Sequence, residues 1–312
     1  MIRIADPGPQ TTVQDLGRFG QLRQGIPPSG PMDMRAFLIA NRLVANADSA
    51  AALECTLMGP RFSVETPCAI AVTGAEIPVT VNGEAAPTHA TLVLKPGDAV
   101  RIGAARAGVR AYIAFSGGID VPLALGSRAT YLRGRLGGVE GRGLKRDDVL
   151  RLLPAPVPTP RELSPAPSTP LPSEPEIRVV LGPDVDRFTE EGVAAFLSGP
   201  YELLPQSDRM GARLRGPKIA HARGHDIISD GIALGSIQVP GDGQPIVLLV
   251  DRQSTGGYTK LATVCSFYIG RIGQVKPGQR VRFHAIPIAE AHRLRRAWDA
   301  ELAEVAGGPV AA

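Results

Sequence analysis

The sequence has little cysteine and few aromatic side chains. Its 312 residues include three cysteines, 8 Phe, 5 Tyr and 1 Trp. Because the cysteines are few and odd in number, we expect no disulfide framework and a reducing compartment. The first residues lack the apolar segment of a secretion signal, and apolar runs such as residues 246–250 are too short to span a bilayer. We therefore expect a cytoplasmic protein that does not bind membranes.

No charge of one sign dominates, and several well-known functional motifs are missing. The 34 Lys and Arg and 30 Asp and Glu are scattered, so the net charge of +4 predicts no nucleic-acid partner. The sequence contains neither the phosphate-binding loop of many nucleotidases nor a Gly-x-Ser-x-Gly elbow. His221 and His225 have metal-like spacing, but Gly224 between them argues against the helix that would align them. We therefore expect no metal site.

Glycine and proline, in contrast, are abundant, with 36 and 29 residues. Both favour turns, so an otherwise apolar chain rich in them predicts many short strands. This pattern favours β-barrels or sandwiches over a parallel α/β sheet. Strands are predicted at residues 69–73, 78–83, 91–94, 109–115, 177–181, 236–239, 246–250 and 280–284. Helices are predicted at residues 34–45, capped by Asp33, at 184–197 and at 288–305.

A proline-rich stretch at residues 154–175 reads as a semi-rigid linker between two halves of similar size, residues 1–153 and 176–312. Short motifs recur in the same order in both halves. The clearest pair is Lys-Pro-Gly-Asp-Ala-Val-Arg at 95–101 and Lys-Pro-Gly-Gln-Arg-Val-Arg at 276–282. We interpret the two halves as diverged copies of one domain.

Three loops concentrate polar groups on Gly-rich backbone, which suits ligand binding on a rigid scaffold. They are residues 251–260, residues 14–20 with 27–33, and residues 206–211. We expect these loops to meet in one cleft between the two domains. Alternatively, these loops have only a structural role, with a polar hairpin at residues 251–260 and a packing arm at the N-terminus.

The motifs at residues 11–18, 29–33, 53–57, 207–211, 235–240 and 255–260 resemble, in the same order, the KipA family. That family is also known as the 5-oxoprolinase C subunit or allophanate hydrolase subunit 2, and it is similar to the carboxyltransferase domain of urea carboxylase. The resemblance implies two tandem cyclophilin-like β-barrel domains with a few short helices and a C-terminal helix. It also implies a hetero-complex with two partners, a smaller KipI-like protein and a larger subunit.

The resemblance implies that the complex opens 5-oxoproline to glutamate with ATP hydrolysis. Because the sequence has no nucleotide-binding motif, we expect this chain to be inactive alone. We expect no cofactor on this chain itself and ATP in the complex. The chain carries no fused biotin carboxylase segment, and this favours the 5-oxoprolinase function over the urea carboxylase function. One alternative is a biotin-dependent carboxyltransferase component that acts on urea, with biotin carried by a partner. Another is a non-catalytic regulatory partner of a KipI-like protein.

Either reaction needs a base for an N–H group, donors for developing negative charge on oxygen, and groups that read an amide edge. Residue type and motif position assign the first two roles to Asp208, Arg209, Asp251, Arg252 and Lys260. Substrate binding is assigned to Gln14, Asp15, Arg18, Ser29, Asp33, Gln238, Gln253, Thr255 and Tyr258.

Overall fold

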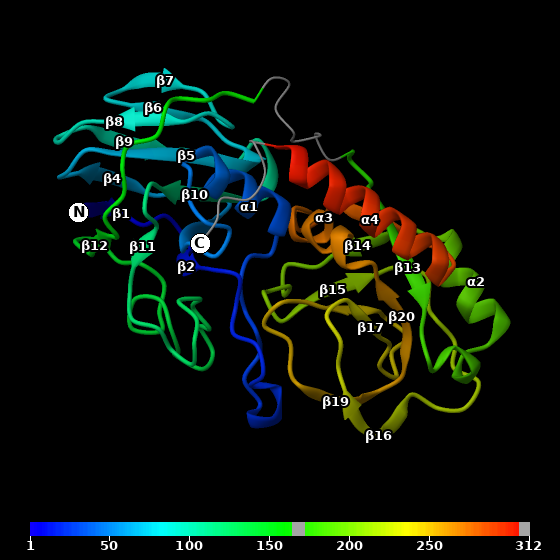
Figure 1. The fold of residues 1–312 in the computed structure, drawn as a ribbon. Helices are drawn as coiled ribbons and strands as arrows, with labels where there is room; N and C mark the ends of the chain where they lie inside the picture. The colour runs from blue at the N-terminus through cyan, green and yellow to red at the C-terminus, as the bar shows by residue number, and fades with distance from the viewer. Residues whose placement is uncertain (164–171, 306–312) are drawn as a thin grey trace. The chain divides into compact units, whose positions relative to one another are not determined.

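A computed structural model of the chain describes residues 1–163 and 172–305. The chain divides into two compact units (Figure 1). The first holds Met1–Phe19, Ser29–Pro170 and the chain from Glu301 onward, and the second holds Gly20–Pro28 and Leu171–Ala300. The predicted linker lies partly outside the described residues. Within its described part, the amide of Leu163 donates to the carbonyl of His89, so residues 161–163 run beside residues 89–91.

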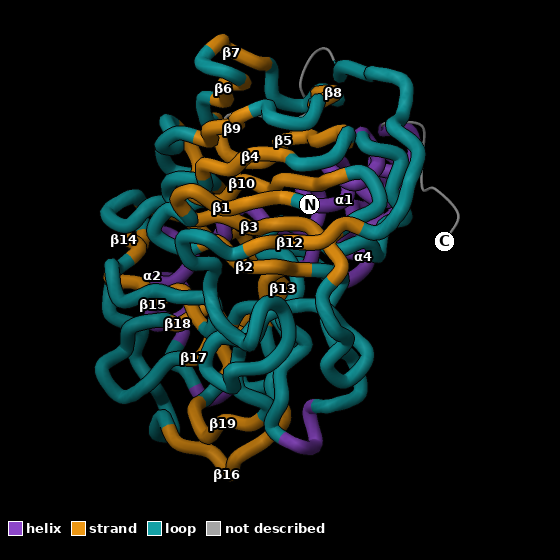
Figure 2. The backbone as a smooth tube through the Cα atoms, turned by 90° about the vertical axis from the view of Figure 1, so that its left-hand side faces the viewer, coloured by secondary structure: helices purple, strands orange, loops and turns teal. Residues whose placement is uncertain are grey.

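The first unit consists of two antiparallel sheets, whose strands lie in successive rows in Figure 2. The seven-stranded sheet has the order β11 (Ile119–Asp120), β12 (Val149–Leu152), β1 (Ile2–Asp6), β4 (Arg61–Val64), β9 (Ala99–Ile102), β6 (Val79–Val81), β7 (Glu84–Ala86). The five-stranded sheet has the order β2 (Thr11–Gln14), β3 (Ala52–Thr56), β10 (Ala107–Phe115), β5 (Cys68–Glu76), β8 (Leu92–Leu94). Alternate residues of both sheets, such as Ile2, Ile4, Leu53 and Ile113, form one buried core.

Helix α1 (Met34–Leu43) packs on β5 and β10. It begins where predicted, because the Asp33 carboxylate accepts a hydrogen bond from the amide of Ala36 at 3.2 Å. The tight hairpin between β6 and β7 is also confirmed. Asn82 and Gly83 have φ values of 53° and 87°, as a two-residue hairpin turn requires.

The second unit contains a closed barrel. Its strand order is β13 (Glu176–Leu181), β20 (Lys260–Val264), β17 (Ser236–Gln238), β18 (Ile246–Leu248), β15 (Gly211–Arg215), β14 (Tyr201–Leu203), β21 (Arg280–Ala285). A parallel pairing of β21 with β13 closes it. A separate two-stranded sheet joins β16 (Asp226–Gly231) and β19 (Thr255–Tyr258). The remaining elements of the chain are η1 (Leu22–Gln24), η2 (Val185–Arg187), α2 (Glu190–Ser198), η3 (Ser266–Tyr268), α3 (Ile269–Gly273) and α4 (Ile288–Glu304).

The mainly β class and the predicted strands are confirmed, and one helix differs from its prediction. Residues 184–197 are split, because Phe188 is extended and Thr189 begins a new helix instead. The Thr189 hydroxyl accepts from the amide of Gly192 at 3.0 Å, which is an N-cap contact.

The repeated Lys-Pro-Gly motif forms the same turn in both units. In the first, the amide of Lys95 donates to the Asp98 carboxylate at 2.7 Å. In the second, the amide of Lys276 donates to the Gln279 side-chain oxygen at 2.9 Å. Gly97 and Gly278 both have positive φ, at 94° and 87°. This shared geometry supports the interpretation of the halves as diverged copies.

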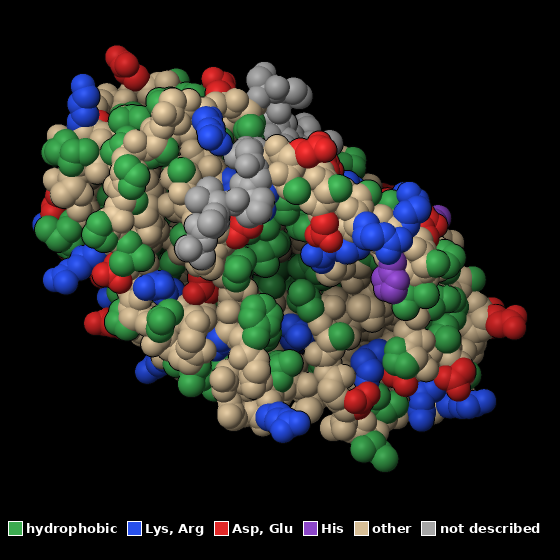
Figure 3. All heavy atoms as spheres, in the orientation of Figure 1, with side chains coloured by type: hydrophobic (Ala, Val, Ile, Leu, Met, Phe, Trp, Pro, Cys, Tyr) green, Lys and Arg blue, Asp and Glu red, His purple; other side chains and the backbone are tan. Residues whose placement is uncertain are grey.

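The surface charge is mixed and the thiols are shielded. On the face drawn in Figure 3, acidic and basic side chains are interspersed.

All three cysteines are buried and free, and burial raises the pKa of Cys55 to about 12 and of Cys68 to about 11. Among the described residues, no helix is long and apolar enough to cross a membrane.

Candidate functional site

The polar residues of the second unit gather around the β16–β19 sheet. The loop that follows β18 supplies Arg252 and Gln253, and the first residue of β20 is Lys260. The end of β16 supplies Asp230, and Ile232 lies just beyond it. Lys260 lies on a strand of the closed barrel, so its backbone is set by a rigid scaffold, whereas Asp230 belongs to the separate two-stranded sheet.

Arg252 is a buried cation, with 7% of its surface exposed. Its Nε donates to the carbonyl oxygen of Ile232 at 3.0 Å. Within the described residues its side chain forms no salt bridge, and burial lowers the pKa of its guanidinium. A buried guanidinium that lacks a carboxylate is costly for structure alone, so it is suited to bind an anion.

Lys260 is a second buried cation in this cluster. Its Nζ lies 3.1 Å from Asp230 Oδ2 and 3.9 Å from Asp184 Oδ2. The Asp184 carboxylate also accepts from the backbone amide of Lys260 at 2.9 Å. The hydrogen bond from Lys260 is the main cause that lowers the pKa of Asp230, whose side chain is mostly exposed. Asp184 therefore holds the backbone of Lys260, while the exposed Asp230 carboxylate is the nearer ion-pair partner of its Nζ.

Two amide side chains flank Gly256. A Cβ atom at this position would lie 2.7 Å from Gln238 Nε2, 3.2 Å from Gln253 Nε2 and 2.6 Å from the end of the Ile232 side chain. The absence of a side chain therefore lets both amides reach the same stretch of backbone. Amide groups offer a donor and an acceptor each, which suits recognition of another amide.

We expect Gly256→Ala to keep the fold and to lower substrate turnover at least tenfold, because the added methyl group must push Gln238 aside. The matched control is Gly231→Ala, since no atom lies within 4 Å of a Cβ at that glycine of the partner strand. Steady-state kinetics of the assembled complex check this result. Equal turnover of the two variants would show that the space beside Gly256 is not used.

Arg209 and Asp251 form a buried ion pair. Arg209 Nε donates to Asp251 Oδ2 at 2.9 Å, and Arg209 Nη2 lies 3.4 Å from Oδ1. The amide of Asp251 also donates to the carbonyl of Arg209 at 2.9 Å. The pair therefore joins the loop before β15 to the loop after β18. Asp208 is exposed, and its carboxylate accepts from the amides of Met210 and Gly211, which shapes the turn.

The remaining predicted residues of this unit lie on β19. Thr255 and Tyr258 are exposed and pair with Gly231 and Asp226 of β16. The ring of Tyr258 lies 6.4 Å from that of His225. Among the described residues, no group of three potential metal ligands is present.

The predicted residues of the first unit make many contacts within that unit. Gln14 is fully buried and donates to Thr12 and to the carbonyl of Thr130, at 3.0 and 3.2 Å. The Asp15 carboxylate accepts from the Ser127 hydroxyl at 2.6 Å. Arg18 donates to the backbone carbonyls of Ala124 and Ala129, and Asp33 caps α1. Ser29 is buried, with a φ of 58°.

The structure brings Arg252, Lys260, Gln238 and Gln253 together, with Arg209 and Asp251 paired at the base of the same loop. That the loops of the first unit meet this cluster in one cleft stays a prediction. Sequence reasoning missed Asp184 and Asp230. The Gly-Pro-Asp turn at 182–184 is the one local signal that could have indicated the first of them.

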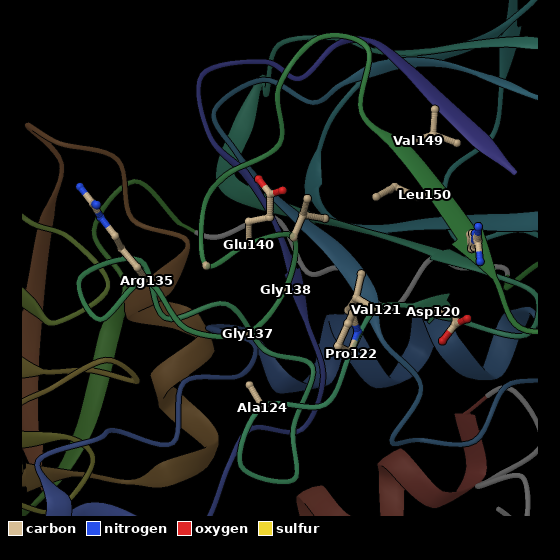
Figure 4. Close-up of a pocket in the computed structure, with 13 residues that line it drawn as sticks. Asp120, Val121, Pro122, Ala124, Arg135, Gly137, Gly138, Glu140, Val149 and Leu150 are labelled. Carbon is tan, nitrogen blue, oxygen red and sulfur yellow. The ribbon is translucent and has the colours of Figure 1, made fainter.

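Sequence reasoning also missed a pocket of about 470 Å³ in the first unit. Figure 4 shows Asp120, Val121 and Pro122 close to one another, with Arg135 extending away from the other labelled side chains. Its lining consists of Asp120, Val121, Pro122, Ala124, Arg135, Gly137, Gly138, Val139, Glu140, Gly141, Val149, Leu150 and Arg151. The lining includes acidic, basic and apolar residues, and it indicates no particular ligand.

Comparison with known proteins identifies the family. The profile of the carboxyltransferase domain, subdomains A and B, matches residues 24–285. The chain belongs to this family. It is 37% identical to the C subunit of 5-oxoprolinase from Escherichia coli, over 95% of this chain and 94% of that protein. The resemblance to the family of 5-oxoprolinase C subunits is thereby confirmed.

The carboxyltransferase relatives also include much longer proteins. The chain is 37% identical to urea amidolyase of Lachancea kluyveri over 98% of its own length, but it spans 18% of that protein. The crystal structure of Kluyveromyces lactis urea amidolyase superposes with a TM-score of 0.92 at 35% identity. That match covers 96% of this chain and 20% of the other. The fold of this chain is therefore that of a carboxyltransferase domain.

Proposed function

We propose that this chain is the C subunit of an ATP-dependent 5-oxoprolinase complex, in which it helps to open 5-oxoproline to glutamate. Arg252 carries the proposal, because it is a buried guanidinium without a carboxylate partner in the described chain. 5-Oxoproline offers a carboxylate for such a cation and a lactam amide for Gln238 and Gln253. The likeness to the E. coli protein supports the same choice.

In this role the chain's own residues bind and orient the lactam. Arg252 and Lys260 hold negative charge, either on the substrate carboxylate or on the oxygen that becomes negative as the ring opens. The two amide side chains at Gly256 set the plane of the lactam. The complex is completed by two partners, a smaller KipI-like protein and a larger subunit, and ATP is consumed there.

A second candidate is carboxyl transfer to urea from carboxybiotin carried by a partner. The fit to Kluyveromyces lactis urea amidolyase favours it, with a TM-score of 0.92. The residues present suit this group as well, since Gln238 and Gln253 match a planar ureido group and Arg252 and Lys260 match its carboxylate. Carboxybiotin would supply the carboxyl group to be transferred.

Reconstitution decides between the two reactions. The chain is co-expressed with a KipI-like protein and a larger subunit, and glutamate release from 5-oxoproline is measured with and without ATP. We expect ATP-dependent release by the complex and none by the isolated chain. Transfer of carboxyl groups to urea in a biotin-dependent assay, without glutamate release, would favour the second candidate. Failure to co-purify with either partner would contradict the proposal.

A further inference from the structure

The strand that carries Lys260 has an irregularity directly after this residue. Strands β17 and β20 pair Ile237 with Ala262, but the next pair is Gln238 with Lys260. Leu261 is therefore an extra residue on β20, which is the defining feature of a β-bulge. Bulges re-aim side chains, and they are frequent beside active sites.

The bulge decides the face on which Lys260 lies. In a ladder without it, Gln238 would pair with Leu261, and Lys260 would pair one position further on, with Val239. Directly opposite residues of an antiparallel pair share a face, and successive residues of a strand alternate between faces. A shift of one residue therefore moves Lys260 to the face of Gln238. The bulge brings together a cation and an amide of the candidate site.

The amide of Lys260 is held by a side chain. It donates to the Asp184 carboxylate at 2.9 Å. Asp184 occupies the N-cap position of η2, where an aspartate ordinarily accepts from an amide of its own helix. Its side chain makes no such cap hydrogen bond. The carboxylate instead reaches a strand that lies 76 positions later in the chain.

The turn before Asp184 fits closely against the same bulge. A Cβ atom at Gly182 would lie 2.5 Å from the carbonyl oxygen of Lys260, which is closer than non-bonded atoms approach. The amide of Gly182 donates to the carbonyl of Leu261 at 2.7 Å. Asp184 Oδ2 is 3.9 Å from Lys260 Nζ, which is too long for a hydrogen bond. The turn therefore contacts the bulge mainly through its backbone.

We propose that Asp184 is a positioning residue, which acts by holding the backbone amide of Lys260 at the bulge and not by its charge. This inference rests on the proposed function, in which Lys260 holds negative charge on the substrate. With the bulge fixed, the Lys260 side chain starts from the face of Gln238 before substrate arrives. A group that is already in place need not be ordered during the reaction.

The kinetic test compares three variants. Asp184→Ala removes the acceptor and should lower kcat/KM of the complex at least tenfold, since misplaced groups are felt on this scale. Asp184→Asn keeps an oxygen without the charge, so kcat/KM should stay within about threefold of wild type. Gln279→Ala removes the matched contact in the same unit, where the Lys276 amide donates to a side-chain oxygen at 2.9 Å. It should lower the Tm as Asp184→Ala does and leave kcat/KM unchanged.

A second measurement does not depend on turnover. Acetic anhydride modifies accessible lysine amines, and mass spectrometry gives the rate at buried Lys260 relative to exposed Lys218. In the isolated, folded chain, Asp184→Ala should raise this ratio severalfold, because the start of β20 is no longer held. Asp184→Asn and Gln279→Ala should leave the ratio at its wild-type value.

Wild-type kcat/KM in a folded Asp184→Ala variant would overturn the proposal, and so would an equal loss in Asp184→Asn. If Asp184→Ala does not fold, Asp184→Ser replaces it, since its shorter side chain does not reach the amide. Failure of both to fold would make Asp184 a structural residue. If the wild-type complex releases no glutamate from 5-oxoproline, the proposed function fails on its own. The labelling ratio of Lys260 then decides, and an unchanged ratio in Asp184→Ala contradicts the positioning role.

Discussion

Replacing Arg252 by methionine should lower kcat/KM of the assembled complex by about a hundredfold or more, the scale on which lost charge-stabilising donors are felt. The same change should leave the free energy of unfolding unchanged or higher. Methionine keeps most of the side-chain volume, and it removes a buried charge that forms no salt bridge within the described chain. Enzyme kinetics and urea unfolding measure the two effects separately.

Two control variants sharpen this result. Arg252→Lys keeps the charge but loses the planar fork of donors, so an intermediate loss is expected. Arg215→Met removes an exposed arginine that pairs with Glu202 on a neighbouring strand. It should change neither kcat/KM nor the free energy of unfolding. If Arg252→Met unfolded the chain, or left turnover at the wild-type level, Arg252 would be a structural residue.

Unlike Arg252→Met, Arg209→Met should lower stability, and it should destabilise the second unit by about 3–5 kcal/mol. This variant leaves the Asp251 carboxylate buried without its partner, and breaking a buried pair from one side costs energy on that scale. Both residues are well shielded, at 6% and 4% exposure. Urea unfolding of the isolated chain, followed by circular dichroism, measures the loss.

The double variant Arg209→Met with Asp251→Leu tests the cause. Removing both charges leaves neither member of the ion pair buried without the other, so most of the lost stability should return. A double variant as unstable as Arg209→Met alone would show that the loss comes from packing rather than charge. Asp251→Asn is informative for catalysis only if its folding is intact, because the pair joins two loops of the site.

Local features of the fold could be predicted because they depend on neighbouring residues. Asp33 before an apolar periodic stretch indicates a helix start, and Asn82-Gly83 between alternating valines indicates a hairpin. The helix predicted at residues 184–197 was wrong in its first turn. Both Asp184 and Thr189 are residue types that cap helices, and sequence alone does not show which of the two begins the helix.

The site could be predicted only in part, for a physical reason. Arg252 and Lys260 lie close in sequence, so the motif at 251–260 indicated both. Their contacts depend on distant residues, since Asp184 is 76 positions before Lys260 and Asp230 is 30 positions before it. The roles of Arg209 and Asp251 could not be known either, because the closed barrel brings together residues that are 42 positions apart.

The Lys-Pro-Gly turn shows which contact fixes the geometry that occurs in both halves of the chain. Its fourth residue is Asp98 in one half and Gln279 in the other, and both accept the amide of the lysine three positions before. Lys145 and Asp148 make the same contact at 2.7 Å, without the proline or the glycine. The turn therefore needs an acceptor oxygen on the residue three positions after the lysine, and it needs neither a charge nor a particular residue type there.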